Sequence, residues 1–180
     1  NDSNDDVVLE TILENATYVV CLLGPNKSKS RKQPEYIPGS MFTFIRRLYQ
    51  FMMKSESVKL FLYQATAITV DTKGRAPALS NFLKYSQKIL TNSNNDRMQK
   101  DHDSIVEYIG KKSSKSNKID YIVTRPGSTR EGKSCKRLAA SKSQPGPIPI
   151  TYVDLAEFNL CALQLKKLYN TCPYVVGDGF

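Results

Sequence analysis

The sequence predicts an α/β fold, a doubly wound and mostly parallel sheet with helices on both faces. Apolar runs of strand length alternate along the 180 residues with segments whose apolar positions recur every three to four residues. The strand-like runs are rich in β-branched and aromatic residues, which favour extended structure. A chain of this length forms one domain with a substantial core, so we expect a single domain over residues 1–180.

The first expected unit is a helix over residues 7–16 that leads into a strand. Ser3 or Asp5 is in place to cap the helix. The run "TYVVCLLG" at 17–24 is apolar throughout and ends at a glycine, a pattern typical of a strand buried on both faces. The apolar face of the helix consists of Val8, Leu9, Ile12 and Leu13.

A second unit follows the breakers Pro34, Pro38 and Gly39. Ser40 is expected to cap a long helix, and "VKLFLYQ" at 58–64 is expected to be the next strand. The apolar face of this helix consists of Met41, Phe44, Ile45, Leu48 and Met52.

The second half repeats the alternation. A polar region with Gly74 and Pro77 precedes two helical patterns, and the strand "IDYIVT" comes next. The segment "PGPIPITYV" predicts a short strand, and Asp154 together with Glu157 predicts the cap of the helix that follows. The segment "PYVVG" predicts a last strand. The helical faces are Leu79, Phe82 and Leu83; Met98, Ile105 and Ile109; and Phe158, Cys161, Leu165 and Leu168.

The net charge of +9 is concentrated in three predicted loops, 25–39, 111–118 and 128–147. We expect such lysine-rich loops to contact an acidic surface of a protein partner or larger complex, or nucleic acid. A third alternative is peripheral association of the protein with the anionic surface of a membrane. Alternatively they are solvated loops with no partner, because Ser, Lys and Asn bury too little apolar area to order themselves.

The cysteines and the hydropathy restrict the class of protein. The four cysteines have no C-x-x-C pair, which argues against zinc and for free thiols. Cys21 and Cys161 are expected in the core, whereas Cys135 lies in a basic loop that could activate a thiol. No run of about 18 apolar residues occurs, and "NDSNDD" is unlike a signal peptide.

Four segments, taken in order, resemble the atypical short-chain dehydrogenase/reductases, especially the NmrA-like group. They are "NDSNDDVVLETILENATYVVCLLG", "VKLFLYQATA", "KIDYIVTRPG" and "ITYVDLAEFNLCAL". The resemblance implies a Rossmann-like domain that binds NADP or NAD. Its cofactor-binding positions would be Leu23, Gly24, Gln64, Ala65, Lys100, Pro126 and Gly127.

The family's glycine-rich phosphate turn has no counterpart among the nine glycines. Either residues preceding Asn1 carry it or the phosphate site is lost, and an opening in mid-fold favours the first alternative, an N-terminally incomplete domain.

The family's Tyr-x-x-x-Lys pair is matched formally only by Tyr108 and Lys112, which lie too late in the helix. Lys100 is better placed, but the residue four before it is Asp96. The expected serine at the end of "VKLFLYQATA" is replaced, and Thr66 supplies the nearest hydroxyl.

Three functional hypotheses follow. The missing pair favours a non-catalytic pseudoenzyme that acts as a scaffold, regulator or assembly subunit. The alternatives are an NAD(P)H-dependent oxidoreductase in which Lys100 is the one candidate catalytic residue, and an RNA-associated protein that uses its basic loops. His102, the single histidine, is expected to be structural because it shares a helical face with Met98. A reduced, soluble chain of this family suits a eukaryotic cytoplasm or a plastid stroma.

Overall fold

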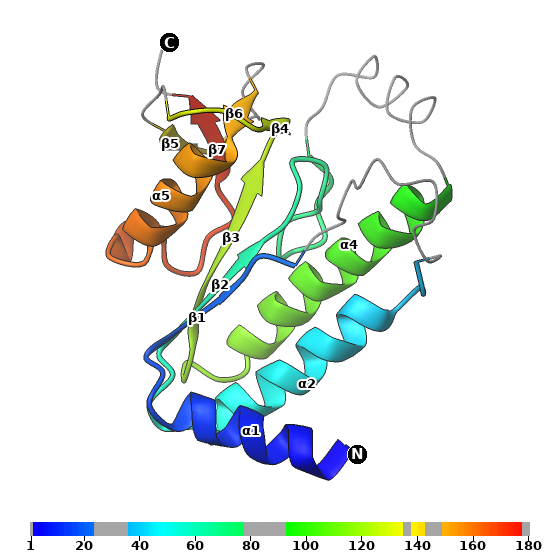
Figure 1. The fold of residues 1–180 in the computed structure, drawn as a ribbon, viewed down its shortest axis with the longest axis vertical. Coiled ribbons are helices and arrows are strands. Elements are labelled where there is room, and N and C mark those ends of the chain that lie inside the picture. Colours follow the sequence, from blue (N-terminus) through cyan, green and yellow to red (C-terminus); the bar gives the residue numbers. More distant parts are fainter. Residues whose placement is uncertain (1, 24–35, 78–92, 135–137, 143–148, 178–180) are drawn as a thin grey trace.

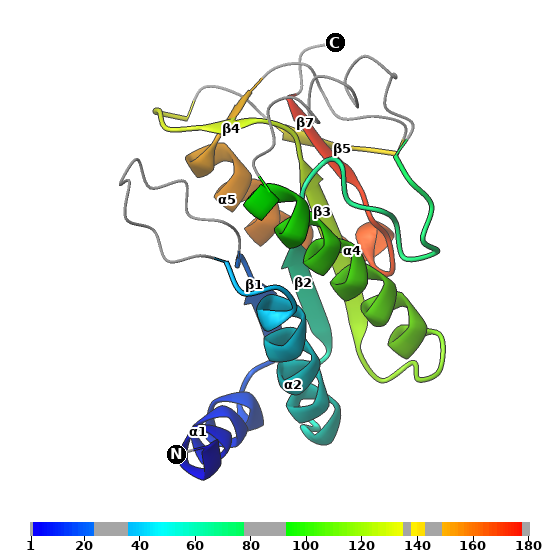
Figure 2. The same ribbon diagram turned by 90° about the vertical axis from the view of Figure 1, so that its right-hand side faces the viewer.

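The computed structural model describes residues 2–23, 36–77, 93–134, 138–142 and 149–177. It confirms the predicted fold class, since a mostly parallel sheet is covered by helices on both faces (Figures 1 and 2). The main sheet has the strand order β1-β2-β3-β7-β5, in which only β5 runs antiparallel to its neighbour. A separate pair joins β4 to β6. The strands are β1 (Tyr18–Cys21), β2 (Leu60–Gln64), β3 (Asp120–Pro126), β4 (Thr129–Arg130), β5 (Leu138–Ser141), β6 (Ile150–Thr151) and β7 (Tyr174–Gly177).

Helices α2 and α4 cover one face of the sheet, and α5 covers the other (Figure 2). Helix α1 packs beside α2 at the lower end of the molecule in Figure 1. Among the described residues, no helix combines the length and apolar character needed to cross a membrane. The helices are α1 (Asp2–Glu14), α2 (Ser40–Lys54), α4 (Ser93–Ser113) and α5 (Tyr152–Ala162), followed by a 3-10 turn at Lys166–Leu168.

Strand alternation divides the interior into two apolar cores. Phe61 and Tyr63 of β2 point toward α2 and α4, whereas Leu60 and Leu62 point toward α5. In β3, Ile122 joins the core under α5. The predicted helix faces contribute most of their residues, with Ile45, Leu48, Met52, Ile105 and Ile109 all buried, whereas Phe44 is 43% exposed.

The prediction that the first strand is buried on both faces was wrong. β1 is the edge strand of the described sheet, and only Cys21 is buried, while Tyr18 and Val20 are exposed. The face of α1 is likewise only partly covered, because Leu13 is buried but Val8 and Ile12 are not. An apolar run therefore identified the strand correctly but not its neighbours. The predicted caps Ser3 and Asp5 also lie within α1, which begins at Asp2.

Two other helix caps differ from the sequence prediction. Helix α2 begins at Ser40, but its N-cap is Gly39 at φ 81°, a left-handed conformation that favours glycine. The predicted cap of α5 from Asp154 and Glu157 lies three residues too late, because the N-cap is Thr151. The Thr151 hydroxyl accepts the Asp154 amide at 3.1 Å, and the Asp154 carboxylate accepts the Thr151 hydroxyl at 2.6 Å.

Two of the three predicted basic loops include regular structure. Residues 128–147 contain β4 and β5, and α4 continues to Ser113 inside the predicted loop 111–118. Most of 25–39, the pattern at Leu79, Phe82 and Leu83, and Cys135 lie outside the described residues. Helix α5 ends at Ala162, so Leu165 and Leu168 lie in the following turn. Cys161 is exposed, contrary to its predicted place in the core, because it lies on the outer face of α5.

The amino-terminal end of α2 is satisfied by a carboxylate from another helix. Asp101 of α4 accepts the backbone amides of Gly39 at 2.9 Å and Phe42 at 3.3 Å, and the Tyr36 hydroxyl at 2.5 Å. Burial, together with the Asp101 carboxylate, raises the pKa of Tyr36 to about 12, so its phenol remains protonated and donates. A buried negative charge at a helix N-terminus is favourable, and it fixes α2 against α4.

Arg125 ties the end of β3 to two neighbouring segments. Its guanidinium donates to the Cys172 carbonyl at 3.0 and 2.6 Å and to the Thr69 carbonyl at 3.3 Å. It also stacks 3.9 Å above the Tyr174 ring. Its side-chain hydrogen bonds in the described structure go to carbonyl oxygens, so this buried cation anchors loops.

Replacing Arg125 with methionine removes three hydrogen bonds and leaves two carbonyls without their donor. We expect a loss of about 2–4 kcal/mol in the free energy of unfolding, measured with urea. The unfolding free energy of Arg125→Lys should lie between those of the wild type and Arg125→Met, because a lysine ammonium cannot reproduce the planar guanidinium fork. Arg130→Met removes an exposed arginine from β4 and is the matched control. Equal stability of R125M and R130M would contradict the anchoring role.

His102 is a structural histidine, as its position on the Met98 face predicted. It is 2% exposed, and its Nδ1 lies 2.6 Å from the hydroxyl of buried Tyr63. Its Nε2 has no hydrogen-bond partner among the described residues. Burial lowers the pKa of His102 to about 4, and the Asp101 charge offsets this only in part.

This depressed pKa makes folding sensitive to acid. An unfolded histidine binds its proton near pH 6.5, so stability is present above that pH and is lost as the pH falls from about 6.5 to about 4. The slope should approach about 1.4 kcal/mol per pH unit.

The comparison protein is His102→Gln, which offers Tyr63 a neutral partner. The difference in unfolding free energy between wild type and this variant should shrink as the pH falls. Parallel stability curves for the two proteins would show that His102 does not titrate in this range.

Candidate functional site

The carboxyl ends of β1, β2 and β3 lie side by side because these strands are parallel and paired in register. This edge is where open parallel sheets bind ligands. Gln64 and Pro126 are the last residues of β2 and β3, and Ala65 and Gly127 follow them. Ala65 is buried and donates its amide to the Thr124 carbonyl at 2.8 Å.

The other predicted cofactor positions are less tightly grouped. Leu23 follows β1 and is exposed, whereas Gly24 lies outside the described residues. Lys100 is exposed on α4. Its neighbour Gln99 reaches the loop after β2, so this part of α4 lies near the strand ends.

Three buried or half-buried polar side chains meet at the ends of β2 and β3. The register places Gln64 opposite Thr124, and both side chains lie on the α5 face of the sheet. The side-chain amide of Asn159 donates to the side-chain oxygen Oε1 of Gln64 at 2.9 Å. Thr124 and Asn159 are 0% and 3% exposed. The Thr124 hydroxyl and the Asn159 carbonyl oxygen have no partner in the described structure, and buried polar atoms of this kind require an explanation.

A second polar network holds the loop after β2 against α4. The Thr66 hydroxyl donates to the side-chain oxygen Oε1 of Gln99 at 2.8 Å and lies 3.0 Å from the Thr69 hydroxyl. The side-chain amide of Gln99 donates to the Thr69 hydroxyl and to the Asp103 carboxylate. The same carboxylate also accepts a hydrogen bond from the backbone amide of Val70. Burial raises the pKa of the Asp103 carboxyl. The hydroxyl predicted to replace the family serine is thus fixed in place by hydrogen bonds.

The loop also approaches α4 closely where Gly110 faces Thr72. A β-carbon at Gly110 would lie 2.5 Å from the Thr72 carbonyl oxygen, so only glycine fits without movement. The path of the loop past the strand ends therefore depends on a backbone contact that the sequence pattern does not reveal.

The formal Tyr-x-x-x-Lys match consists of a half-buried ring that packs against the core and an exposed lysine. The Tyr108 ring packs edge-on against Phe42 and Tyr49, and Lys112 lies 5.5 Å from its centroid. Both residues lie near the carboxyl end of α4, far along the helix from Gln99. Asp96, which occupies the position four before Lys100, is exposed.

Several site residues were missed by sequence reasoning. Asn159 was overlooked although it interrupts the apolar face that Leu155, Phe158 and Ala162 form on α5, and a polar residue on such a face is a usable signal. Gln99 carries no comparable signal because it lies in a polar stretch. No group of three metal-ligating side chains occurs within the described ranges.

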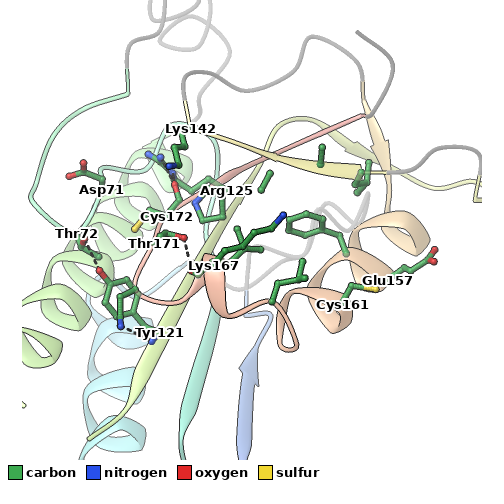
Figure 3. A pocket seen from close by; sticks show the side chains of 18 of the residues that line it. Asp71, Thr72, Tyr121, Arg125, Lys142, Glu157, Cys161, Lys167, Thr171 and Cys172 are labelled. Carbon is green, nitrogen blue, oxygen red and sulfur yellow. Dashed lines mark hydrogen bonds between the residues drawn. The ribbon is translucent and has the colours of Figure 1, made fainter. Parts of the chain in front are cut away.

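A broad groove of about 1340 Å³ lies apart from these residues (Figure 3). It runs between α5, the loop at 71–75, the edge strand β5 and the segment 171–173 that precedes β7. None of the predicted cofactor positions lines it. Asp154, which does, is occupied by the hydroxyls of Ser134 and Thr151 and serves as part of the helix cap.

Comparison with known proteins finds the fold in solved structures but no sequence relative. No protein-family model matches the chain, and no curated protein matches it. ChuY, an anaerobillin reductase from Escherichia coli, is 12% identical with a TM-score of 0.61, over 98% of this chain and 72% of that one. A putative NAD-dependent epimerase/dehydratase from Bacillus halodurans is 16% identical with a TM-score of 0.55, over 93% and 67%.

A short-chain dehydrogenase/reductase from Veillonella parvula, solved in complex with NADP, is similar in the same way. It is 13% identical with a TM-score of 0.57, over 97% of this chain and 69% of that one. At these identities the likeness concerns the fold alone. The chain has the Rossmann-like α/β architecture found in structures of reductases, epimerases and short-chain dehydrogenases.

Proposed function

We propose that this chain forms part of an NAD(P)H-dependent oxidoreductase of the atypical short-chain dehydrogenase class. The observation that carries the proposal is the set of buried, unpartnered polar atoms of Thr124 and Asn159 beside Gln64, at the carboxyl ends of the central strands. A carboxamide such as that of nicotinamide has both a donor and an acceptor for such atoms. The fold shared with the Veillonella protein that was solved in complex with NADP supports a dinucleotide as the ligand.

The residues at this edge suit the nicotinamide end of a dinucleotide. Ala65 and Gly127 are small, which suits the approach of a flat ring to the backbone, and Pro126 is a buried apolar neighbour. Lys100 is the group proposed to hold the ribose and to assist proton transfer, since Asp96 replaces the tyrosine acid. A bound nicotinamide would supply the hydride.

The diphosphate requires a different part of the protein. The described residues contain no glycine-rich turn followed by a helix N-terminus. In the described structure β1 is the edge strand of the main sheet, and its side chains Tyr18 and Val20 are 41% and 40% exposed. We infer that a strand-turn-helix unit carrying the phosphate site pairs with this edge.

The decisive measurement is equilibrium binding of NADPH and NADH by the full-length protein, followed by nicotinamide fluorescence. Lys100→Met should weaken binding about tenfold, the loss expected for one charge-assisted contact. Lys111→Met is the matched control, because Lys111 is also exposed on the same helix but lies three turns away and pairs with Glu107.

Turnover separates the two functional hypotheses. An oxidoreductase that depends on Lys100 should lose most of its NADPH-dependent activity in the Lys100→Met variant. Cofactor binding without turnover in the wild type would instead favour the non-catalytic scaffold. Absence of any dinucleotide binding would reject the proposed site.

A further inference from the structure

The groove in Figure 3 follows the edge of the sheet rather than one of its faces. Leu138, Ala139 and Ala140 of β5 all line it, although successive side chains of a strand point to opposite faces. Thr171, Cys172 and Pro173, which precede β7, line it in the same consecutive manner. Three consecutive residues of the four in β5 therefore line the groove, which indicates that it runs along the strand rather than over one face.

This edge has the form of a slot for one more strand. β5 is the last strand in the order of the main sheet, so its outer edge carries no strand in the described structure. Helix α5 and the 3-10 turn form one wall of the groove, and the loop at 71–75 forms the other. Ala139 and Ala140 have small side chains, which lets another backbone approach.

The charges around the slot favour an acidic occupant. Lys73, Lys142 and Lys167 line it, are exposed, and have no ion pair within the described part of the chain. Glu157 is the one exposed carboxylate of the lining that is not paired, since Asp71 is bonded to Arg75 at 2.6 Å. In Figure 3, Lys142 lies above Arg125 at the upper rim, and Lys167 reaches across the middle of the groove.

The size of the groove argues for a polypeptide. Sites for small molecules usually enclose about 300–1,000 Å³, whereas this groove is larger and open along its length. Its floor includes the apolar side chains of Phe158, Leu165 and Leu168. An extended peptide meets all three features, because its backbone pairs with an edge, alternate side chains cover an apolar floor, and the others face the lysines.

We propose that β5 is a docking edge for an extended, acidic peptide segment of a partner protein, which adds a strand to the sheet and places carboxylates beside Lys142 and Lys167. This site is separate from the proposed dinucleotide site, so the two proposals stand or fall independently.

The test uses a fluorescent heptapeptide of alternating glutamate and valine, titrated to about 1 mM, the weak end of measurable affinity. Saturable binding is expected, with slower hydrogen exchange at the backbone amides of 138–141. The double variant Lys142→Glu, Lys167→Glu should weaken binding at least about tenfold, given two lost attractions and two added repulsions. A peptide with a central proline should bind similarly weakly, because it lacks a backbone donor.

The control is Lys112→Glu, Lys115→Glu, which changes the net charge equally but lies outside the groove. It should bind like the wild type, and circular dichroism with thermal melting should show that both double variants are folded. No peptide binding, equal weakening by both variants, or unchanged exchange at 138–141 would overturn the proposal. So would tighter binding of a single-stranded RNA that is lost in the Lys142/Lys167 variant, which would assign the groove to nucleic acid.

Discussion

The parallel pairing of β2 with β3 is the constraint on which the rest of the structure depends. The register runs from Leu60 opposite Asp120 to Gln64 opposite Thr124 without interruption. Because side chains alternate along both strands, this register decides which residues face α4 and which face α5. A slip of one residue would turn the side chains of Phe61 and Tyr63 from the α4 layer to the α5 layer. The residues of both cores would then lose their packing partners.

The same register places polar groups where the strands end. Thr124 faces α5, so it meets Asn159, whereas Arg125, one residue later, faces the opposite layer and reaches the carbonyls of Thr69 and Cys172. In the described structure, the α5 layer therefore has unpartnered polar atoms of Thr124 and Asn159 at the strand ends, whereas the unpartnered atom of the α4 layer is Nε2 of His102. Asp101 completes that layer by satisfying the first turn of α2. The unpartnered atoms of Thr124 and Asn159 leave hydrogen-bonding capacity at the strand ends, where we propose that a ligand binds.

The sequence predicted the strands and helices that form the central sheet, because the apolar periodicity of β2, β3 and α4 reflects burial that does not depend on distant residues. It failed for β1, since an apolar run has the same appearance at an edge as in the interior. It also missed β5, whose short "LAAS" segment lies between basic stretches and is fixed only by antiparallel pairing with β7. The cap of α2 was unpredictable for a similar reason, because Asp101 is 62 residues from Gly39.

The candidate site follows the same division. Strand ends such as Gln64 and Pro126 could be located from the sequence, because the end of a parallel strand fixes a position at the edge of the sheet. The partners of those ends could not, since Asn159 reaches Gln64 across 95 residues. This difference bears on mechanism. The Thr66 hydroxyl is already committed to Gln99 and Thr69, so it positions the loop. Lys100 is exposed and free of such ties among the described residues. In the oxidoreductase that we propose, proton transfer would therefore be assigned to Lys100 rather than to the Thr66 hydroxyl.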